Sequence, residues 1–335
     1  MKRICPVFAA AFALLIGFPQ SSSAYGGRGA GAALVLSETP PGRHGGAHGR
    51  AQGKGEEQAH SEHRAGPEKT WYLNRHDLAP DAAAYIVRPD GTVAEGKLEH
   101  GGNGWAFKVD TLPMDGTQDG IFTLYVVDRI VADNMLQIRV AKANMINHSC
   151  GWGHQFKFDK ERHRPKSLAW IPLELVGNDL WDASFHSKTM SGDRIAWTVL
   201  DNGAASGNIP VTFTTASGWS RTVETDEDGT ASVQLIRDYY PERWIDFDAR
   251  KKNGLVITAV REYDEQGELD GQSYGTVRIV STLAWKYQPA RADYRSYAFG
   301  LGVTALVAVA SGAGVYAYRG RRRKPFEEAE PDDEA

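Results

Sequence analysis

An uncharged stretch near the C-terminal end constrains this chain more than any other sequence feature. It runs from Tyr297 to Tyr318 without a charged residue, and as an α-helix it would extend about 33 Å, enough to cross the hydrocarbon core of a bilayer. Arg295 precedes it, whereas a basic cluster follows it: Arg319, Arg321, Arg322, Arg323 and Lys324. Because the more cationic flank of a span stays in the cytoplasm, we expect a transmembrane helix at 297–318 and a cytoplasmic tail at 319–335.

Small residues recur at four-residue spacing within this predicted helix. Ala308 with Gly312 and Ala310 with Gly314 form two such pairs. These pairs allow a second helix to approach closely, which favours docking to another membrane protein. The alternative interpretation is that they reflect only the ordinary abundance of small residues in membrane helices.

The beginning of the sequence has the pattern of a secretory signal peptide. Lys2 and Arg3 precede an apolar run that ends near Phe18, and a serine cluster with Ala24 follows. A charged start, a short apolar region and a small-residue cleavage site define such a signal. We therefore expect residues 1–24 to be removed. The predicted location is a bacterial inner membrane, crossed once, with the N-terminal body in the periplasm.

Residues 25–68 are rich in glycine and nearly free of large apolar side chains after Leu36. Such a segment buries too little surface to fold, so we expect a disordered linker. Imidazole is a common ligand for nickel, copper, zinc and cobalt, and the candidate ligands here are His44, His48, His60 and His63. The alternative is a soluble linker whose histidines titrate freely.

Short segments of alternating apolar and polar residues fill most of the remaining chain. Gly120–Arg129 and Leu255–Val260 have the pattern of strands, and turn residues separate such runs at roughly ten-residue spacing. This rhythm is typical of antiparallel sandwiches. We predict an all-β fold, with two immunoglobulin-like antiparallel β-sandwich domains at 69–146 and 168–290 plus the one C-terminal transmembrane helix.

A loop at 147–167 separates the two predicted domains, and soft metal ligands gather around its start. Cys150 would be the only cysteine after signal removal, because Cys5 belongs to the signal. Thiolate, thioether and imidazole favour nickel, cobalt, copper or zinc over calcium or magnesium, and the candidate ligands are Met145, His148, Cys150 and His154. Two alternatives stay open: a loop with a buried thiol, in which Met145 is core filler, or an intermolecular disulfide.

Composition and motifs argue against several classes of function. The chain has 38 Lys and Arg against 42 Asp and Glu, a net charge of -4, so it lacks the basic excess of a nucleic-acid-binding protein. It contains no phosphate-binding loop, nucleophile elbow or zinc-protease motif. We predict that the chain is not an enzyme, and we assign it no firm cofactor.

The second predicted domain resembles a known bacterial family. The segments that carry the resemblance are PLELVGNDLW, SGDRIAWTVLDNG, IPVTFTTASGW and TDEDGTASVQL, between residues 172 and 235. They resemble exported domains of unknown function that accompany nickel and cobalt uptake systems. The membrane anchor is similar to that of small accessory subunits of energy-coupling-factor nickel transporters. The resemblance covers residues 168–320 and supplies no ligand residue.

The resemblance and the candidate ligands together predict a membrane-anchored periplasmic accessory component of a nickel or cobalt uptake transporter. Its cargo would be a nickel, cobalt or copper ion, which the chain binds or presents. Its partners would be a permease, docked through the transmembrane helix, and an ATPase. The alternative is a metal-independent interaction module of the cell envelope. In that case the part of the linker that carries His44, His48, His60 and His63, called here the histidine segment, is only a linker.

Overall fold

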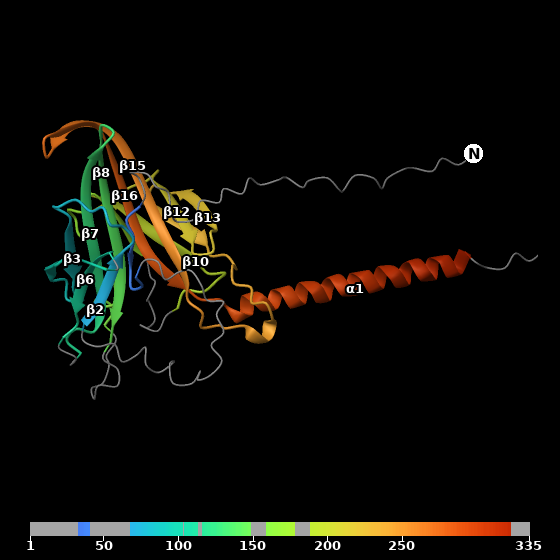
Figure 1. Cartoon of the computed structure of the whole chain (residues 1–335). Coiled ribbons are helices and arrows are strands. Elements are labelled where there is room, and N and C mark those ends of the chain that lie inside the picture. Colours follow the sequence, from blue (N-terminus) through green and yellow to red (C-terminus); the bar gives the residue numbers. More distant parts are fainter. Residues whose placement is uncertain are drawn as a thin grey trace, which may run out of the picture. The chain divides into compact units, whose positions relative to one another are not determined.

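The computed structural model describes residues 33–40, 68–102, 104–112, 116–148, 159–177 and 188–322. Within these ranges the chain forms β-strands in three sheets, followed by a long C-terminal helix (Figure 1). The prediction of an all-β fold with one C-terminal helix is confirmed. The predicted signal peptide, residues 1–24, lies outside the described ranges.

The largest sheet has eight strands in the order β13-β12-β15-β16-β8-β7-β3-β4. Neighbouring strands are antiparallel except β16 and β8, which pair in parallel. Along the chain these strands are β3 (Ala83–Val87), β4 (Val93–Gly96), β7 (Gly120–Ala132), β8 (Met135–Asn147), β12 (Pro210–Thr215), β13 (Ser220–Glu224), β15 (Asn253–Leu269) and β16 (Gln272–Tyr287).

Two tight turns close the longest hairpins of this sheet. Asp133 and Asn134 join β7 to β8 with φ angles of 52° and 61°, and Asp270 and Gly271 join β15 to β16 at 49° and 77°. Positive φ at both central residues matches the right-handed twist of the flanking strands, and Asn, Asp and Gly adopt it at least cost. Each turn therefore sets the register of the strand residues next to it, and in the β15–β16 hairpin the register shifts once more between Asp264 and Gly267.

A four-stranded sheet packs on the half of the large sheet that contains β3, β7 and β8. Its order is β1-β2-β6-β5, and its Trp71 and Phe107 belong to one apolar core with Phe122, Leu124 and Met145 of the large sheet. The strands are β1 (Leu36–Ser37), β2 (Glu68–Leu73), β5 (Glu99–Gly101) and β6 (Gly104–Asp110).

A second small sheet packs on the other half. In it β10 pairs with β9, β11 and β14. Trp197 of β10 lies against Phe213 of β12, with ring centroids 5.6 Å apart, and Ile257 of β15 belongs to the same core. The strands are β9 (Leu173–Gly177), β10 (Arg194–Asp201), β11 (Ala204–Ala205) and β14 (Thr230–Gln234).

The register shows that the two small sheets cover opposite faces of the large one. Paired residues on adjacent strands point to the same face, and successive residues alternate. Lys142 pairs with Leu283, and Leu283 pairs with Ile257 in the second core. Ala143 is the next residue after Lys142 and pairs with Leu124 in the first core. One continuous sheet therefore serves as a layer of both sandwiches.

This shared sheet corrects the predicted domain organisation. The prediction gave separate sandwiches to residues 69–146 and 168–290, whereas β8 of the first range pairs directly with β16 of the second. A parallel pairing between strands so distant in sequence leaves no local pattern, because its register depends on neither a turn nor a short loop. The predicted loop at 147–167 thus separates the two ranges in sequence but not in the sheet.

The predicted linker at 25–68 also needs a correction. Within it, Leu34, Val35 and Leu36 are buried, and β1 pairs with β2. This apolar run carries enough surface to join the first core. The disorder prediction is therefore wrong for residues 33–40, and the rest of the linker up to residue 67 lies outside the described ranges.

Helix α1 (Arg291–Arg322) follows β16 after three residues. Its segment Phe299–Arg322 is long and apolar enough to cross a membrane, with a mean hydropathy of 1.7 and no burial inside the protein. Such an exposed apolar helix fits a single-pass membrane anchor. It extends beyond the predicted 297–318 at both ends and takes in Arg319, Arg321 and Arg322 of the predicted tail.

Candidate functional site

Most of the predicted metal ligands lie outside the described residues. These are Cys150 and His154 of the Cys/His loop, and His44, His48, His60 and His63 of the histidine segment. The described ranges contain Met145 and His148. Within these ranges, no group of three or more His, Cys, Asp or Glu side chains is placed to hold a metal ion.

Met145 lies in the apolar core between the large sheet and the β1-β2-β6-β5 sheet. It is buried and pairs with Phe122 of β7, and its cluster includes Leu124 and Ala143. A thioether in such surroundings fills space between apolar side chains. The structure thus places Met145 in the role of core filler that the sequence left open.

His148 lies directly after the last residue of β8, and the pairing of β8 fixes where this end is. β8 runs parallel to β16, and Ala143 pairs with Ala284. β16 ends three residues beyond Ala284, at Tyr287, and α1 begins at Arg291. The Cys/His loop therefore leaves the sheet at the same end from which the chain enters α1. We call this end of the large sheet the helix-side end.

The histidine segment is attached to the same end. The Lys286 Nζ atom donates a hydrogen bond to Glu38 Oε2 at 2.6 Å, shortly before the segment begins. Lys69, directly after the segment, reaches Ile146 near the end of β8, with Nζ 3.5 Å from the carbonyl oxygen. Both attachment points of residues 41–67 thus lie at the helix-side end.

Glu38, Lys69 and Lys286 form a partly buried charge cluster beside these attachment points. Burial raises the pKa of Glu38, but the nearby Lys286, Lys69 and Lys252 outweigh it and lower the pKa below its usual value. Burial lowers the pKa of Lys69, against the attraction of Glu38. The cluster therefore keeps Glu38 ionised and ties β1 to β16.

A second charged group lies inside the protein, between the two halves of the chain. Lys142 of β8 and Glu174 of β9 form an ion pair with side chains 0% and 1% exposed. Tyr125 Oη donates to Glu174 Oε1 at 2.6 Å, and the Leu168 backbone N–H donates to Glu174 Oε2 at 3.0 Å. Since both charged side chains are shut off from solvent, this group serves structure and is a poor place for a substrate.

Burial dominates the electrostatics of this closed group. It lowers the pKa of Lys142, although Glu174 acts in the opposite direction. It also raises the pKa of Tyr125 far above its usual value, and Glu174 adds to that rise. Both shifts follow from the high cost of placing charge in a medium of low polarity.

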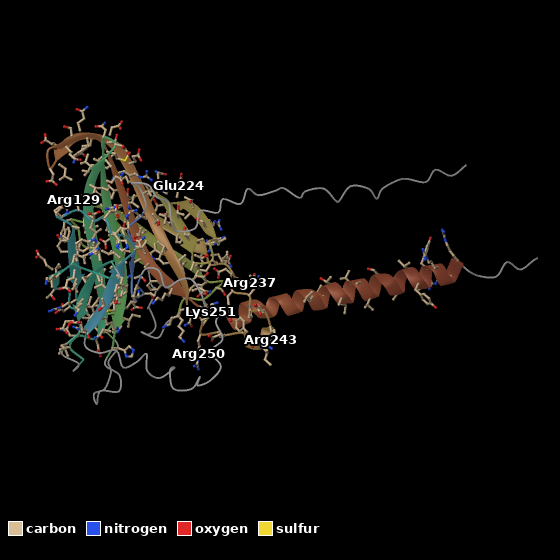
Figure 2. The ribbon with its side chains drawn as sticks, in the orientation of Figure 1. Arg129, Glu224, Arg237, Arg243, Arg250 and Lys251 are labelled. Atoms are coloured by element: carbon tan, nitrogen blue, oxygen red, sulfur yellow. The ribbon has the colours of Figure 1, made fainter. Side chains whose placement is uncertain are left out.

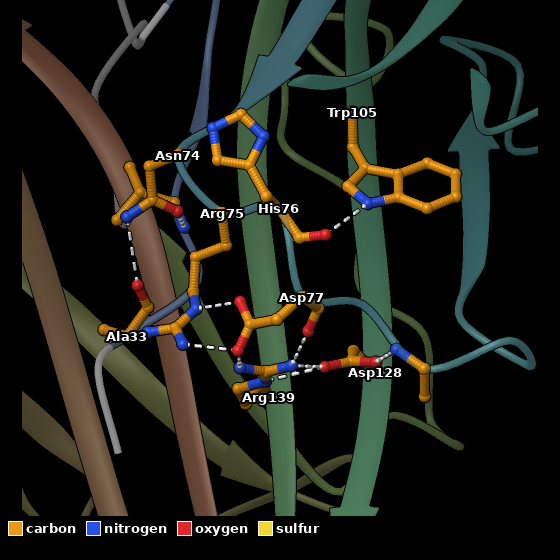
Figure 3. Close-up of polar contacts among 10 residues, drawn as sticks. Ala33, Asn74, Arg75, His76, Asp77, Trp105, Asp128 and Arg139 are labelled. Carbon is orange, nitrogen blue, oxygen red and sulfur yellow. Dashed lines mark hydrogen bonds and ion pairs between the residues drawn. The ribbon is translucent and has the colours of Figure 1, made fainter. Parts of the chain in front are cut away.

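An arginine network lies on the opposite face of β8 (Figure 3). Arg139 Nε donates to Asp128 Oδ2 at 2.6 Å, and Arg139 Nη2 donates to the Asp77 carbonyl oxygen at 2.8 Å. The other Asp128 oxygen accepts the Ala79 backbone N–H at 2.8 Å. Arg75 binds the Asp77 carboxylate through Nε at 2.6 Å and Nη2 at 2.5 Å. The network pins residues 75–79 to the large sheet.

Sequence reasoning missed both charged groups. The only available signal was a charged residue at an inward position of an otherwise apolar strand, as with Lys142 in β8 and Glu174 in β9. Buried charges require partners, but the sequence does not show which partner lies opposite.

No family model matches this chain, and no curated protein matches it. Solved structures similar to it include a tetra-tandem repeat from the extending region of a large adhesion protein, at 14% identity, 66% coverage of this chain, 45% of that chain and a TM-score of 0.18. A DUF4785 family protein from Legionella pneumophila matches at 14% identity, with 57% and 46% coverage and a TM-score of 0.20.

The D0-D1 domain of intimin matches at 13% identity, with 65% of this chain and 88% of that chain covered and a TM-score of 0.19. The chain spans less than half the length of the adhesion repeat and of the Legionella protein. At these identities and TM-scores the likenesses carry no functional argument for this chain.

Proposed function

We propose that this chain is a membrane-anchored accessory component of a transition-metal uptake transporter, with nickel or cobalt as cargo and its β-sheet body in the periplasm. One observation carries the proposal. The Cys/His loop and the histidine segment are both attached at the helix-side end of the large sheet, where α1 begins. In this proposal the helix-side end faces the membrane, and both sets of candidate ligands are tethered to it.

This arrangement suits the handover of an ion to a permease. Imidazole and thiolate ligands favour nickel, cobalt and copper among divalent cations. The chain from Tyr287 to Phe299, the first residue of the candidate span, keeps the helix-side end within about 26 Å of that span. The small-residue pairs Ala308/Gly312 and Ala310/Gly314 allow close approach of a permease helix. Energy for transport would come from a partner ATPase.

Metal titration of the full chain in detergent tests the direct-binding part of this proposal. We expect micromolar binding of nickel or cobalt by calorimetry, weakened by the triple change of His148, Cys150 and His154 to Ala. The matched control is His100→Ala, because His100 lies in β5 at the opposite end of the four-stranded sheet. Absence of binding to nickel, cobalt, copper and zinc would contradict the proposal.

Copurification tests the partner. We expect a permease and an ATPase to be recovered with the full chain from native membranes, and Gly312→Leu to reduce their recovery because it blocks close helix approach. Val309→Leu is the control, as it changes the size of a neighbouring apolar position without removing a small residue. Equal recovery with both variants would argue against docking through this face.

The second candidate is a metal-independent interaction module of the cell envelope. One observation favours it: over β12, β13 and β15 the large sheet presents a polar face that includes Thr212, Thr222 and Thr258, and neither small sheet packs there in the described ranges. Among the described residues, this polar face is available to a partner. Deletion of residues 40–66 discriminates the two candidates, because an interaction module would keep its partners without these residues.

A further inference from the structure

The loop between β14 and β15, residues 236–252, combines exposed apolar groups with cations. Ile245 is 88% exposed and Tyr240 is 70% exposed. Five cations occur in the same loop: Arg237, Arg243, Arg250, Lys251 and Lys252. Isolated exposed apolar residues are ordinary on a soluble surface, but this loop places them beside cations at a particular end of the molecule.

The loop is a built structure with Tyr239 at its centre. The Tyr239 ring lies against Phe247 with centroids 5.7 Å apart, and Lys251 Nζ lies 4.3 Å from the Tyr239 ring centroid. Tyr239 Oη donates to the Asp246 carbonyl oxygen at 3.3 Å. These contacts hold the backbone around Ile245 in place while its side chain points away from the core.

Three of the four carboxylates of the loop accept hydrogen bonds from nearby groups, and Glu242 is the fourth. Arg243 forms a bidentate pair with Asp246, at 2.8 and 3.1 Å. Asp238 accepts from Ser217 Oγ at 2.5 Å, and Asp248 accepts the Arg250 backbone N–H at 2.8 Å. Figure 2 shows Arg243, Arg250 and Lys251 gathered in this region, whereas Arg129 lies far from it on the sheet.

The topology places this loop beside the entry to α1. The loop ends at β15, whose first residue, Asn253, pairs with Tyr287, the last residue of β16. Gln288 Nε2 also donates to the Arg250 carbonyl oxygen at 3.4 Å. Phe299 is the first residue of the candidate span. Four extended residues from Tyr287 to Arg291 and eight helical residues from Arg291 to Phe299 give a maximum distance of about 26 Å between Tyr287 and Phe299. The loop is therefore tethered within about this distance of the candidate span.

We propose that the loop at 236–252 lies in the interfacial region of the same bilayer that holds α1. Ile245 and Tyr240 sit at the boundary of headgroups and acyl chains, and Arg250 and Lys251 face lipid phosphates. Aromatic and aliphatic side chains with adjacent cations suit this region, where apolar bodies contact chains and charged tips stay hydrated. The inference rests on the proposed membrane anchoring, and it makes the loop a second contact that fixes the helix-side end against the bilayer.

Site-specific photo-crosslinking in lipid nanodiscs tests this contact. A benzophenone amino acid replaces Ile245, Tyr240 or, as the matched control, Tyr263 in the full chain, and lipid adducts are measured by mass spectrometry. Tyr263 is also partly exposed but lies ten residues further along β15 from Asn253, about 33 Å away along the strand. We expect lipid adducts at positions 245 and 240 and none at 263.

A benzophenone at Val309 inside α1 separates the failure of this inference from the failure of anchoring. Adducts at 309 without adducts at 245 or 240 would overturn the loop contact and leave the anchor intact. No adducts at any position would overturn both. Crosslinks from 245 to a second copy of the chain, in place of lipid, would also overturn the proposal. All four positions are exposed on the protein surface, Val309 included, so the replacements leave the cores unchanged.

Discussion

The two charged groups that flank β8 are close in sequence but differ in how they meet solvent. Lys142 and Arg139 lie three residues apart on opposite faces of the strand. The Lys142–Glu174 pair is closed, whereas the Arg139 network continues from buried Asp128 to Asp77, whose side chain is 56% exposed. Charge enclosed on all sides depends wholly on its partner, while charge with a path to water does not. The two groups should therefore respond differently to loss of a partner.

Removal of Glu174 should be the most damaging change. Glu174→Leu leaves the Lys142 ammonium buried without its carboxylate, which costs about 3–5 kcal/mol of unfolding free energy. Denaturant unfolding of the full chain in detergent, followed by β-sheet circular dichroism, measures this loss.

The double variant Lys142→Met/Glu174→Leu should recover most of that stability, because it removes the charge together with its partner. The surface control is Glu161→Gln, which breaks the exposed pair of Glu161 with Arg164 and should cost less than about 0.5 kcal/mol. A Glu174→Leu variant as stable as Glu161→Gln would show that the closed group does not depend on its ion pair.

Removal of Asp128 tests the Arg139 network, which reaches solvent at Asp77, in the same way. Asp128→Asn should lower the unfolding free energy by about 2–3 kcal/mol. This loss is smaller than that of Glu174→Leu, because Arg139 keeps its hydrogen bond to the Asp77 carbonyl oxygen at 2.8 Å. The same unfolding measurement applies. A larger loss for Asp128→Asn than for Glu174→Leu would reverse the proposed difference between the groups.

The sequence was enough to predict the local parts of this fold. The alternation in Gly120–Arg129 predicts a strand, and the uncharged run at 297–318 predicts the helix; both lie within observed elements. Turn residues such as Asp133 and Asn134 are also local signals. These features depend on neighbours within a few residues, which is why the pattern reveals them.

The remaining features depend on contacts between distant residues. The parallel pairing of β8 with β16 joins the two predicted sandwiches through one shared sheet, and it places His148 at the helix-side end. Burial of Leu34 requires the core supplied by later strands. For the candidate site, the types of ligand were readable from the sequence, whereas their attachment to the helix-side end required the topology.

Removal of the Tyr125 hydroxyl should have a moderate effect on the closed group. Tyr125→Phe deletes the hydrogen bond to Glu174 Oε1 but keeps the ring in the core, so the expected cost is about 1–2 kcal/mol. Tyr263→Phe at an exposed position is the matched control and should be neutral within error. A loss as large as that of Glu174→Leu would mean that the hydroxyl, and not the lysine, is the main partner of the carboxylate.

Removal of the Asp77 carboxylate should have the smallest effect, and it should depend on pH. The hydrogen bonds from Arg75 are the main cause that lowers the pKa of Asp77 from 3.8 to about 2. Because the folded-state pKa lies below the unfolded value, this stabilisation is present above pH 3.8 and is lost as the pH falls towards 2. Solvent screening at a side chain this exposed limits it to less than about 1 kcal/mol.

The measurement is the difference in unfolding free energy between the wild-type chain and Asp77→Asn at pH 6, 4 and 2. We expect the wild type to be slightly more stable at pH 6 and the difference to shrink towards pH 2, where about half of the folded-state carboxylates are protonated. The control repeats the Asp77→Asn change in the Lys142→Met/Glu174→Leu background, which lacks the buried ion pair but keeps Asp77. The stability difference caused by Asp77→Asn should show the same pH dependence in this background. A difference that stays constant down to pH 2 would mean that the charge of the Asp77 carboxylate does not stabilise the fold. The Arg139 network would then depend at its exposed end on the Asp77 backbone carbonyl alone.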